Sequence, residues 1–125
     1  MFERGTKLIR RAQITVMALF VEIRSYNLKP GNREEFHRLF VKTALPMLKR
    51  WNVDVMRYGA SSHDEDTYYL MRAYASLEDR QQSQDAFYGS DEWKLRPREP
   101  IIALIENYTL IVIETEESTV DVLRQ

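Results

Sequence analysis

An arginine and several aromatic side chains are the residues of this sequence best suited to hold a small ligand. Arg24 and Tyr26 stand two positions apart, so in an extended strand both point to the same face. The planar guanidinium could bind a carboxylate or carbonyl oxygen, and the tyrosine hydroxyl could donate to the same group. A flat substrate could lie against aromatic rings, here those of Tyr58, Tyr68, Tyr74 and Trp93. The ligand-binding candidates are Arg24, Tyr26, Tyr58, Tyr74 and Trp93, with packing in a core or an interface as the alternative.

Patterns for metal, covalent and phosphate chemistry are missing from the sequence. The chain has no cysteine, so it has neither a thiolate nucleophile nor a cysteine zinc site. His37 is not an expected metal ligand, because its basic neighbours place it on the solvent-exposed face of a helix. His63 precedes the acidic residues 64–66, but this spacing fits no zinc or calcium pattern and is typical of a solvated loop. With no serine triad order or glycine-rich phosphate loop either, we expect no metal and no cofactor, and the sequence identifies no catalytic residue.

Length and charge fit a single globular domain. The 125 residues are 44% hydrophobic, and 18 basic against 19 acidic side chains give a net charge of −1. No overall basic field exists to attract a phosphate backbone, so nucleic acid is not an expected partner. The apolar stretch from Ile14 to Val21 is too short to cross a bilayer, so we expect no membrane and a cytoplasmic protein. We divide the chain into a basic N-terminal extension (1–16), a domain (17–115) and an acidic, solvated tail (116–125).

The domain reads as alternating strands and helices. Alternation of apolar and polar residues, and enrichment in β-branched and aromatic residues, predict strands at 19–26, 53–61, 67–74 and 107–115. A helix is expected after Asn32, interrupted by Pro46, because proline lacks an amide hydrogen. A second, polar surface helix begins at the capping box of Ser76, and Asp91 caps a short third one. The order βαββαβ predicts a ferredoxin-like α+β fold: a four-stranded antiparallel sheet with helices on one face and the first and third strands in the middle.

Two helices cover only one face of such a sheet, and the residues of the other face are too apolar for water. If Val21 and Ile23 point at the helices, the alternate residues point away. On this basis the dimer interface candidates are Phe20, Glu22, Leu70, Arg72 and Leu110, although the last strand could instead present Ile111 and Ile113. A second copy would bury this face, and Glu22 would pair with Arg24 or Arg72 because buried charges need partners.

Four segments resemble the NIPSNAP family. They are residues 20–31 (FVEIRSYNLKPG), Leu45-Pro46, residues 74–80 (YASLEDR) and residues 91–93 (DEW). The resemblance spans about residues 17–114 and implies a dimeric α+β barrel, in which two ferredoxin-like subunits form a homodimer. The wider superfamily includes cofactor-free monooxygenases, haem-degrading enzymes, lactone isomerases and stress-response barrels, so the resemblance implies a fold more firmly than a reaction.

Two functional hypotheses follow. The first is a cytoplasmic homodimer that binds a small aromatic or acidic organic molecule between sheet and helices, either as a binding protein or as a cofactor-independent monooxygenase or isomerase. The second is a non-catalytic protein-interaction module whose barrel is filled with side chains. Whether the protein is an enzyme stays open. A ligand-sized cavity beside Arg24, Tyr26, Tyr58 and Tyr74 would favour the first hypothesis, and a filled interior the second.

Overall fold

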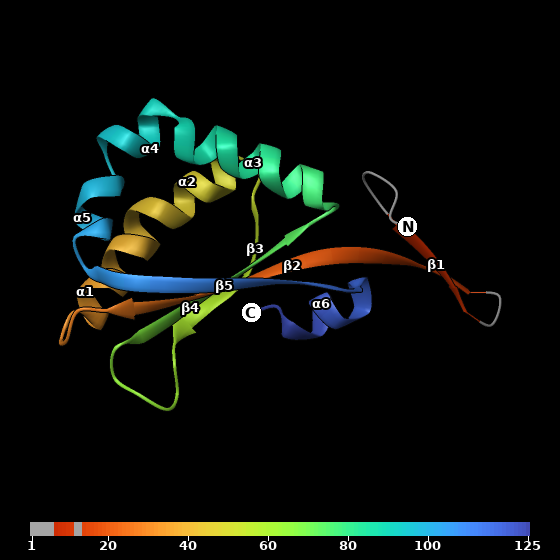
Figure 1. Ribbon diagram of the computed structural model, residues 1–125, viewed down its shortest axis with the longest axis horizontal. Coiled ribbons are helices and arrows are strands. Elements are labelled where there is room, and N and C mark those ends of the chain that lie inside the picture. Colours follow the sequence, from red (N-terminus) through yellow and green to blue (C-terminus); the bar gives the residue numbers. More distant parts are fainter. Residues whose placement is uncertain (1–6, 12–13) are drawn as a thin grey trace.

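Strands and helices alternate along the chain in the predicted order. The computed structural model describes residues 7–11 and 14–125, and the four strands and three helical segments expected from the sequence are present in it (Figure 1). The strands are β1 (Lys7–Arg11), β2 (Ile14–Leu28), β3 (Asp54–Ala60), β4 (Thr67–Tyr74) and β5 (Ile105–Glu116). The helices are α1 (Arg33–Leu39), the π-helix η1 (Phe40–Ala44), α2 (Leu45–Arg50), α3 (Leu77–Gly89), α4 (Asp91–Leu95), α5 (Arg98–Ile102) and α6 (Glu117–Leu123).

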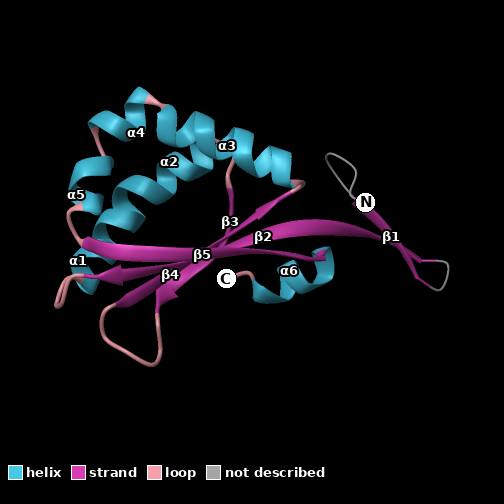
Figure 2. Ribbon diagram, viewed as in Figure 1, coloured by secondary structure: helices cyan, strands magenta, loops and turns pink. Residues whose placement is uncertain are grey.

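The sheet has the predicted ferredoxin-like order. β2 and β4 lie in the middle, β5 pairs with the free side of β2, and β3 pairs with β4, all antiparallel. Helices α1 to α5 form one layer on one face of this sheet (Figure 2). β2 begins at Ile14, before the predicted start, and its first residues pair with β1 in a hairpin that extends past the helices (Figure 1). The rest of the predicted basic extension, residues 1–6 and 12–13, lies outside the described residues.

The first helical segment changes geometry just before its proline. α1 passes directly into the π-helix η1, and α2 follows with Pro46 in its first turn. Because proline has no amide hydrogen and crowds the preceding turn, a wider turn accommodates it without ending the helical path. The predicted interruption at Pro46 therefore takes the form of a π-turn. Phe40 in this turn and Met47 directly after Pro46 both stay buried.

Serine side chains begin the next two helices. The Asp79 amide donates to Ser76 Oγ at 2.9 Å at the start of α3, as the capping box predicts. The Trp93 amide donates to Ser90 Oγ at 3.2 Å, so the cap of α4 is Ser90 and not the predicted Asp91, which is already helical. The sequence did not indicate α5. Its two prolines, Pro97 and Pro100, flank or occupy the first turn, where no intrahelical amide bond is needed.

The two faces of β2 are opposite to those predicted. Glu22, Arg24 and Tyr26 lie under the helices, whereas Val21 and Ile23 lie on the other face. The prediction was wrong because it assigned the more polar set of β2 residues to the open face of the sheet. α3 presents polar side chains toward the sheet, and these satisfy the charge of Glu22.

The predicted dimer interface residues are therefore packed within one subunit. Phe20, Glu22, Leu70 and Arg72 are all buried, and Leu110 lies beside Arg24 on the same helix-covered face. Their assignment to the open face is wrong. The predicted pairing of Glu22 with an arginine is confirmed, but it occurs inside the subunit.

The open face carries an apolar surface that α6 covers in part. Val120 of α6 is fully buried against Val21, Met56 and Ala73. Arg124, just after α6, forms a bidentate ion pair with Asp54 of β3 at 2.6 and 2.8 Å. The segment predicted to be a solvated tail is thus held on the sheet by one apolar residue and one ion pair, while its other residues from 117 to 125 are exposed. α6 lies on the side of the sheet opposite to the other helices (Figure 1).

Candidate ligand pocket between sheet and helices

A cavity of about 440 Å³ lies between the sheet and helices α3 to α5. β2 and β5 form one side of it, and the three helices form the other. Its lining residues are Arg24, Tyr26, Gln81, Gln84, Asp85, Tyr88, Trp93, Arg98, Ile101, Ile102, Ile105 and Tyr108. A volume of this size is in the range of small-molecule pockets, which are mainly apolar with a few polar groups.

The pocket has a buried inner part and an exposed rim. Arg24, Tyr26, Trp93 and Ile101 are each less than 9% exposed, whereas the ring of Tyr108 is half exposed. Of the five predicted ligand-binding residues, Arg24, Tyr26 and Trp93 lie together here. The sequence places them on β2 and α4, and the packing of α4 over the sheet brings them to one cavity.

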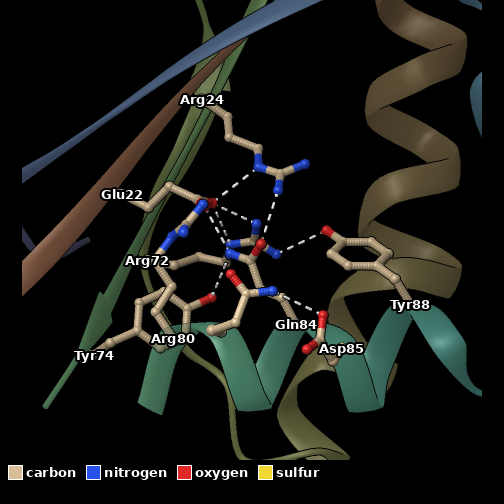
Figure 3. A network of polar contacts seen from close by, with 9 residues as sticks. Glu22, Arg24, Arg72, Tyr74, Arg80, Gln84, Asp85 and Tyr88 are labelled. Atoms are coloured by element: carbon tan, nitrogen blue, oxygen red, sulfur yellow. Dashed lines mark hydrogen bonds and ion pairs between the residues drawn. The ribbon is translucent and has the colours of Figure 1, made fainter. Parts of the chain in front are cut away.

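A polar network lies directly behind the inner part of the pocket. Its centre is the fully buried carboxylate of Glu22, and three guanidinium groups point at it in Figure 3. Arg24 Nε donates to Oε1 at 2.9 Å, Arg72 Nη2 donates to Oε1 at 2.5 Å, and Arg80 Nη2 donates to Oε2 at 2.6 Å. Gln84 Nε2 also donates to Oε2, at 2.6 Å. Residues of β2, β4 and α3 are thereby joined through one side chain.

The surroundings of Glu22 keep its carboxylate ionised. Burial by itself would raise the pKa of Glu22, but the guanidinium groups of Arg72 and Arg24 and the hydrogen bonds from Arg72 and Gln84 lower it to about 2. One negative charge therefore faces three positive charges in this network. The carboxylate of Asp85 on the pocket wall balances a second positive charge, so these five charged side chains together keep a net positive charge. Arg98 lies at the rim of the pocket.

Arg24 connects the network with the pocket. Its Nη2 donates to Gln84 Oε1 at 3.2 Å, and its guanidinium carbon lies 5.5 Å from the ring centre of Tyr88 and 5.2 Å from that of Tyr108. Such distances are typical of cation–π contacts. Tyr88 in turn accepts a hydrogen bond from Arg72 Nη1 at 2.9 Å and packs edge-on against Trp93. Burial raises the pKa of Tyr26 to about 12, so its hydroxyl stays protonated at neutral pH.

Two predicted ligand-binding residues lie outside this cavity. Tyr74 accepts a hydrogen bond from Gln84 at 3.3 Å and belongs to the network behind the pocket. Tyr58 lies on the edge strand β3, with β4 between it and β2, and packs against Phe40, where the nearby Tyr68 hydroxyl lies 2.7 Å from Nδ1 of His37. The aromatic residues named from the sequence thus divide between two regions, because the pocket lies over β2 and β5 and β3 is the edge strand on the opposite side of the sheet.

The sequence interpretation missed the contribution of α3. Arg80, Gln84 and Tyr88 are spaced by four residues and share one helix face, and all three point toward the sheet (Figure 3). This four-residue spacing was the feature of the sequence that could have shown that the three side chains share one face of α3. It was missed because the helix has few apolar residues and reads as a solvated surface helix, whereas its polar face is turned inward.

Neither histidine lies at a metal-binding cluster. Within residues 7–11 and 14–125, no three histidine, aspartate or glutamate side chains are grouped in a way that could hold a metal ion. His63 lies at the exposed hairpin tip between β3 and β4, and its Nδ1 is 2.7 Å from Ser61 Oγ. In the same described part of the chain, no helix has the length and apolar character needed to cross a bilayer.

The sheet order, the layer formed by helices α1 to α5 and the pocket beneath it define a ferredoxin-like α+β protein with a candidate small-molecule site. The sequence model of the NIPSNAP family matches residues 21–115, and the chain belongs to this family. The resemblance carried by the four short segments is thereby confirmed. No curated protein matches the sequence significantly.

Solved structures of similar fold come from several bacteria. A NIPSNAP family protein from Agrobacterium tumefaciens has a TM-score of 0.72 at 19% identity, over 79% of this chain and 87% of its own. A NIPSNAP-like domain protein from Burkholderia xenovorans has a TM-score of 0.71 at 21% identity, over 76% and 83%. An antibiotic biosynthesis monooxygenase-like protein from Chloroflexus aurantiacus has a TM-score of 0.57 at 17% identity, over 78% and 91%. These similarities establish the fold.

Proposed function

We propose that this NIPSNAP protein binds a small aromatic or acidic organic molecule in the pocket between β2, β5 and helices α3 to α5. The observation that carries the proposal is the cavity itself, about 440 Å³, with a buried arginine at its inner part and aromatic and isoleucine side chains around it. A few charged and polar groups in a mainly apolar cavity are the usual arrangement for orienting a small molecule. The cavity also favours this function over an interaction module with a filled interior.

The reaction class to test is cofactor-independent oxidation or isomerisation. The fold is shared with antibiotic biosynthesis monooxygenase-like proteins, and the pocket supplies hydrogen-bond donors and a positive field that could hold a substrate in one orientation. Binding without turnover is the simpler form of the same proposal. Ligand binding is therefore tested first, and turnover afterwards.

A thermal-shift screen tests the binding. Aromatic acids, quinone-like aromatics and small lactones should raise the apparent melting temperature, because a ligand that binds only the folded state stabilises it. Ile102→Trp should abolish the shift by filling the pocket rim without touching the Glu22 network. Leu95→Trp is the matched control, since Leu95 is 81% exposed on α4 and does not line the pocket. If wild type shows no shift with any compound, the binding proposal fails.

The same proposal includes a homodimer formed through the open face of the sheet. Ile111 and Ile113 of β5 are 59% and 42% exposed there, next to Ile23 and the part covered by α6. A second copy turned by a twofold rotation would cover this patch with the same patch. Analytical ultracentrifugation should give a dimer for wild type at micromolar concentration and a monomer for Ile111→Asp. Glu106→Gln, at an exposed position of the same strand, should leave the dimer intact, whereas a wild-type monomer would contradict this part of the proposal.

A further inference from the structure

We propose that the pocket selects a ligand in its ionised form, by holding a ligand oxyanion between Arg24 and Tyr88. The ligand class is a planar apolar molecule that carries an acidic oxygen, such as a phenol, an enol or a carboxylic acid. This inference rests on the proposed function, since it concerns the same pocket. It specifies which end of the ligand lies at the inner part of the pocket and which protonation state of the ligand binds.

Arg24 has donors to spare for such an oxygen. A guanidinium carries five N–H groups, and the hydrogen bonds to Glu22 and Gln84 use two of them. These two bonds fix the plane of the group, and the rings of Tyr88 and Tyr108 flank it. The remaining N–H groups are therefore available to the neighbouring Tyr26 and to a ligand in the pocket, which Arg24 lines. A fixed, buried guanidinium is well suited to a charged oxygen, because little side-chain entropy is lost on binding.

Tyr88 lines the same pocket and has a hydroxyl hydrogen available to donate. Its oxygen accepts the hydrogen bond from Arg72 Nη1 at 2.9 Å, so its own hydrogen is left to point elsewhere. Its ring is held between Phe87 and Trp93, with centroids 4.9 and 5.2 Å away, and it lines the pocket. A hydroxyl whose acceptor side faces a guanidinium donates more strongly, because neighbouring hydrogen bonds polarise one another. Tyr88 should therefore donate to a ligand oxygen beside Arg24.

The charges around the pocket favour an anion at its inner part. Behind the wall, Arg24, Arg72 and Arg80 face the single carboxylate of Glu22. The charged and titratable groups on the pocket wall itself are Arg24 and Tyr26 from β2, Tyr108 from β5, Asp85 and Tyr88 from α3, and Arg98 from α5. Asp85 is the one acid of this lining, and it lies at an exposed position where Gln81 donates to it at 2.9 Å.

The apolar part of the lining fits the body of the ligand. Trp93 and the isoleucines at 101, 102 and 105 line the pocket away from the charged network, and Ile102 is partly exposed at the rim. An aromatic ring placed there would bury apolar surface while its acidic oxygen reached Arg24. A neutral molecule of the same shape would gain the apolar contact but leave the Arg24 donors without a charged partner. The pocket should therefore discriminate between an acid and its neutral isostere.

A pair of chromophoric probes tests this inference. 4-Nitrophenol changes its absorption when it ionises, and 4-nitroanisole is its neutral methyl ether. Wild-type protein should bind the phenolate about tenfold more tightly than the phenol, which lowers the pKa of the bound probe by about one unit. Difference spectra recorded against pH give this shift directly, and 4-nitroanisole should bind at least tenfold more weakly than the phenolate.

Variants separate the two donors from general packing. Tyr88→Phe keeps the ring and should weaken phenolate binding several-fold with little effect on 4-nitroanisole. Arg24→Gln should abolish the preference for the anion, whereas Arg24→Lys, which keeps the charge, should retain part of it. Arg96→Gln removes an exposed arginine outside this pocket and is the control. Far-ultraviolet circular dichroism checks that each variant is folded.

The possible outcomes distinguish this inference from the function on which it rests. If both probes bind equally well to wild type, or Tyr88→Phe binds the phenolate as tightly as wild type, the oxyanion site is refuted while the binding pocket stands. If neither probe shifts the spectrum or the melting temperature at millimolar concentration, both the pocket and the oxyanion site fail. Selective binding of the phenolate that depends on Tyr88 and Arg24 supports both.

Discussion

Arg80 of α3 and Glu22 of β2 stand 58 residues apart and are joined by two hydrogen bonds. Arg80 Nε and Nη2 donate to Glu22 Oε2 at 2.9 and 2.6 Å. The contact attaches the first turns of α3 to the central strand of the sheet. It also completes the set of three arginines around one carboxylate, which makes the inner part of the pocket positive.

Loss of the Arg80 contact should destabilise the protein. Arg80→Gln removes both hydrogen bonds to a buried carboxylate, and we expect the free energy of unfolding to fall by about 2 kcal/mol. Arg38→Gln is the matched control, because it breaks a pair of similar geometry with Glu35 in which both side chains are about half exposed. That change should cost less than about 1 kcal/mol. Urea unfolding measures both, and equal effects would contradict the structural role of Arg80.

Acid should remove the stabilisation that Glu22 provides. Its pKa is lowered to about 2 in the folded protein from an ordinary value of 4.5, so the folded state binds this proton less readily than the unfolded state. The resulting stabilisation, on the order of 3 kcal/mol, is fully present above about pH 5, where the carboxyl is ionised in both states, and is lost as the pH falls toward 2.

Two measurements check this pH dependence. The carbon chemical shift of the Glu22 carboxyl, followed by NMR, should titrate near pH 2 in the folded protein. The difference in unfolding free energy between wild type and Glu22→Gln should be constant above pH 5 and shrink below it. A Glu22 carboxyl that titrates near 4.5 would falsify the proposed electrostatic environment.

Val120 should anchor α6 to the sheet. Val120→Ala removes two methyl groups from a fully buried site against Val21, Met56 and Ala73, and we expect a loss of about 1–2 kcal/mol. Val122→Ala makes the same change on the same helix at a side chain that is 83% exposed, and it should alter stability by less than about 0.5 kcal/mol. Thermal unfolding compares the two. Equal effects would mean that α6 does not pack on the open face.

Two glycines should respond to alanine with opposite signs. Gly31 precedes α1 with φ of +81°, a conformation that side chains with a Cβ adopt at a cost, so Gly31→Ala should destabilise by about 1 kcal/mol. Gly89 ends α3 with open space around its Cα, so Gly89→Ala should be neutral or stabilise by up to about 1 kcal/mol. Chemical denaturation measures the unfolding free energy of both variants. Stabilisation by Gly31→Ala would contradict the turn geometry.

The order of the elements and the family could be recognised in the sequence because both depend on short segments. Alternation along β4, the Ser76 cap of α3 and the interruption at Pro46 are set by residues within a few positions of one another. The same holds for the motifs at residues 20–31 and 74–80.

The tertiary structure decided which face of β2 is covered and where the pocket lies. Alternation has two possible phases, and here both phases contain large apolar residues, so the pattern around Val21 and Glu22 does not say which set faces the helices. The answer depends on Arg80 and Gln84, which approach Glu22 from 58 and 62 residues away. The pocket likewise combines side chains from two strands and three helices, and only packing brings such distant parts of the chain together.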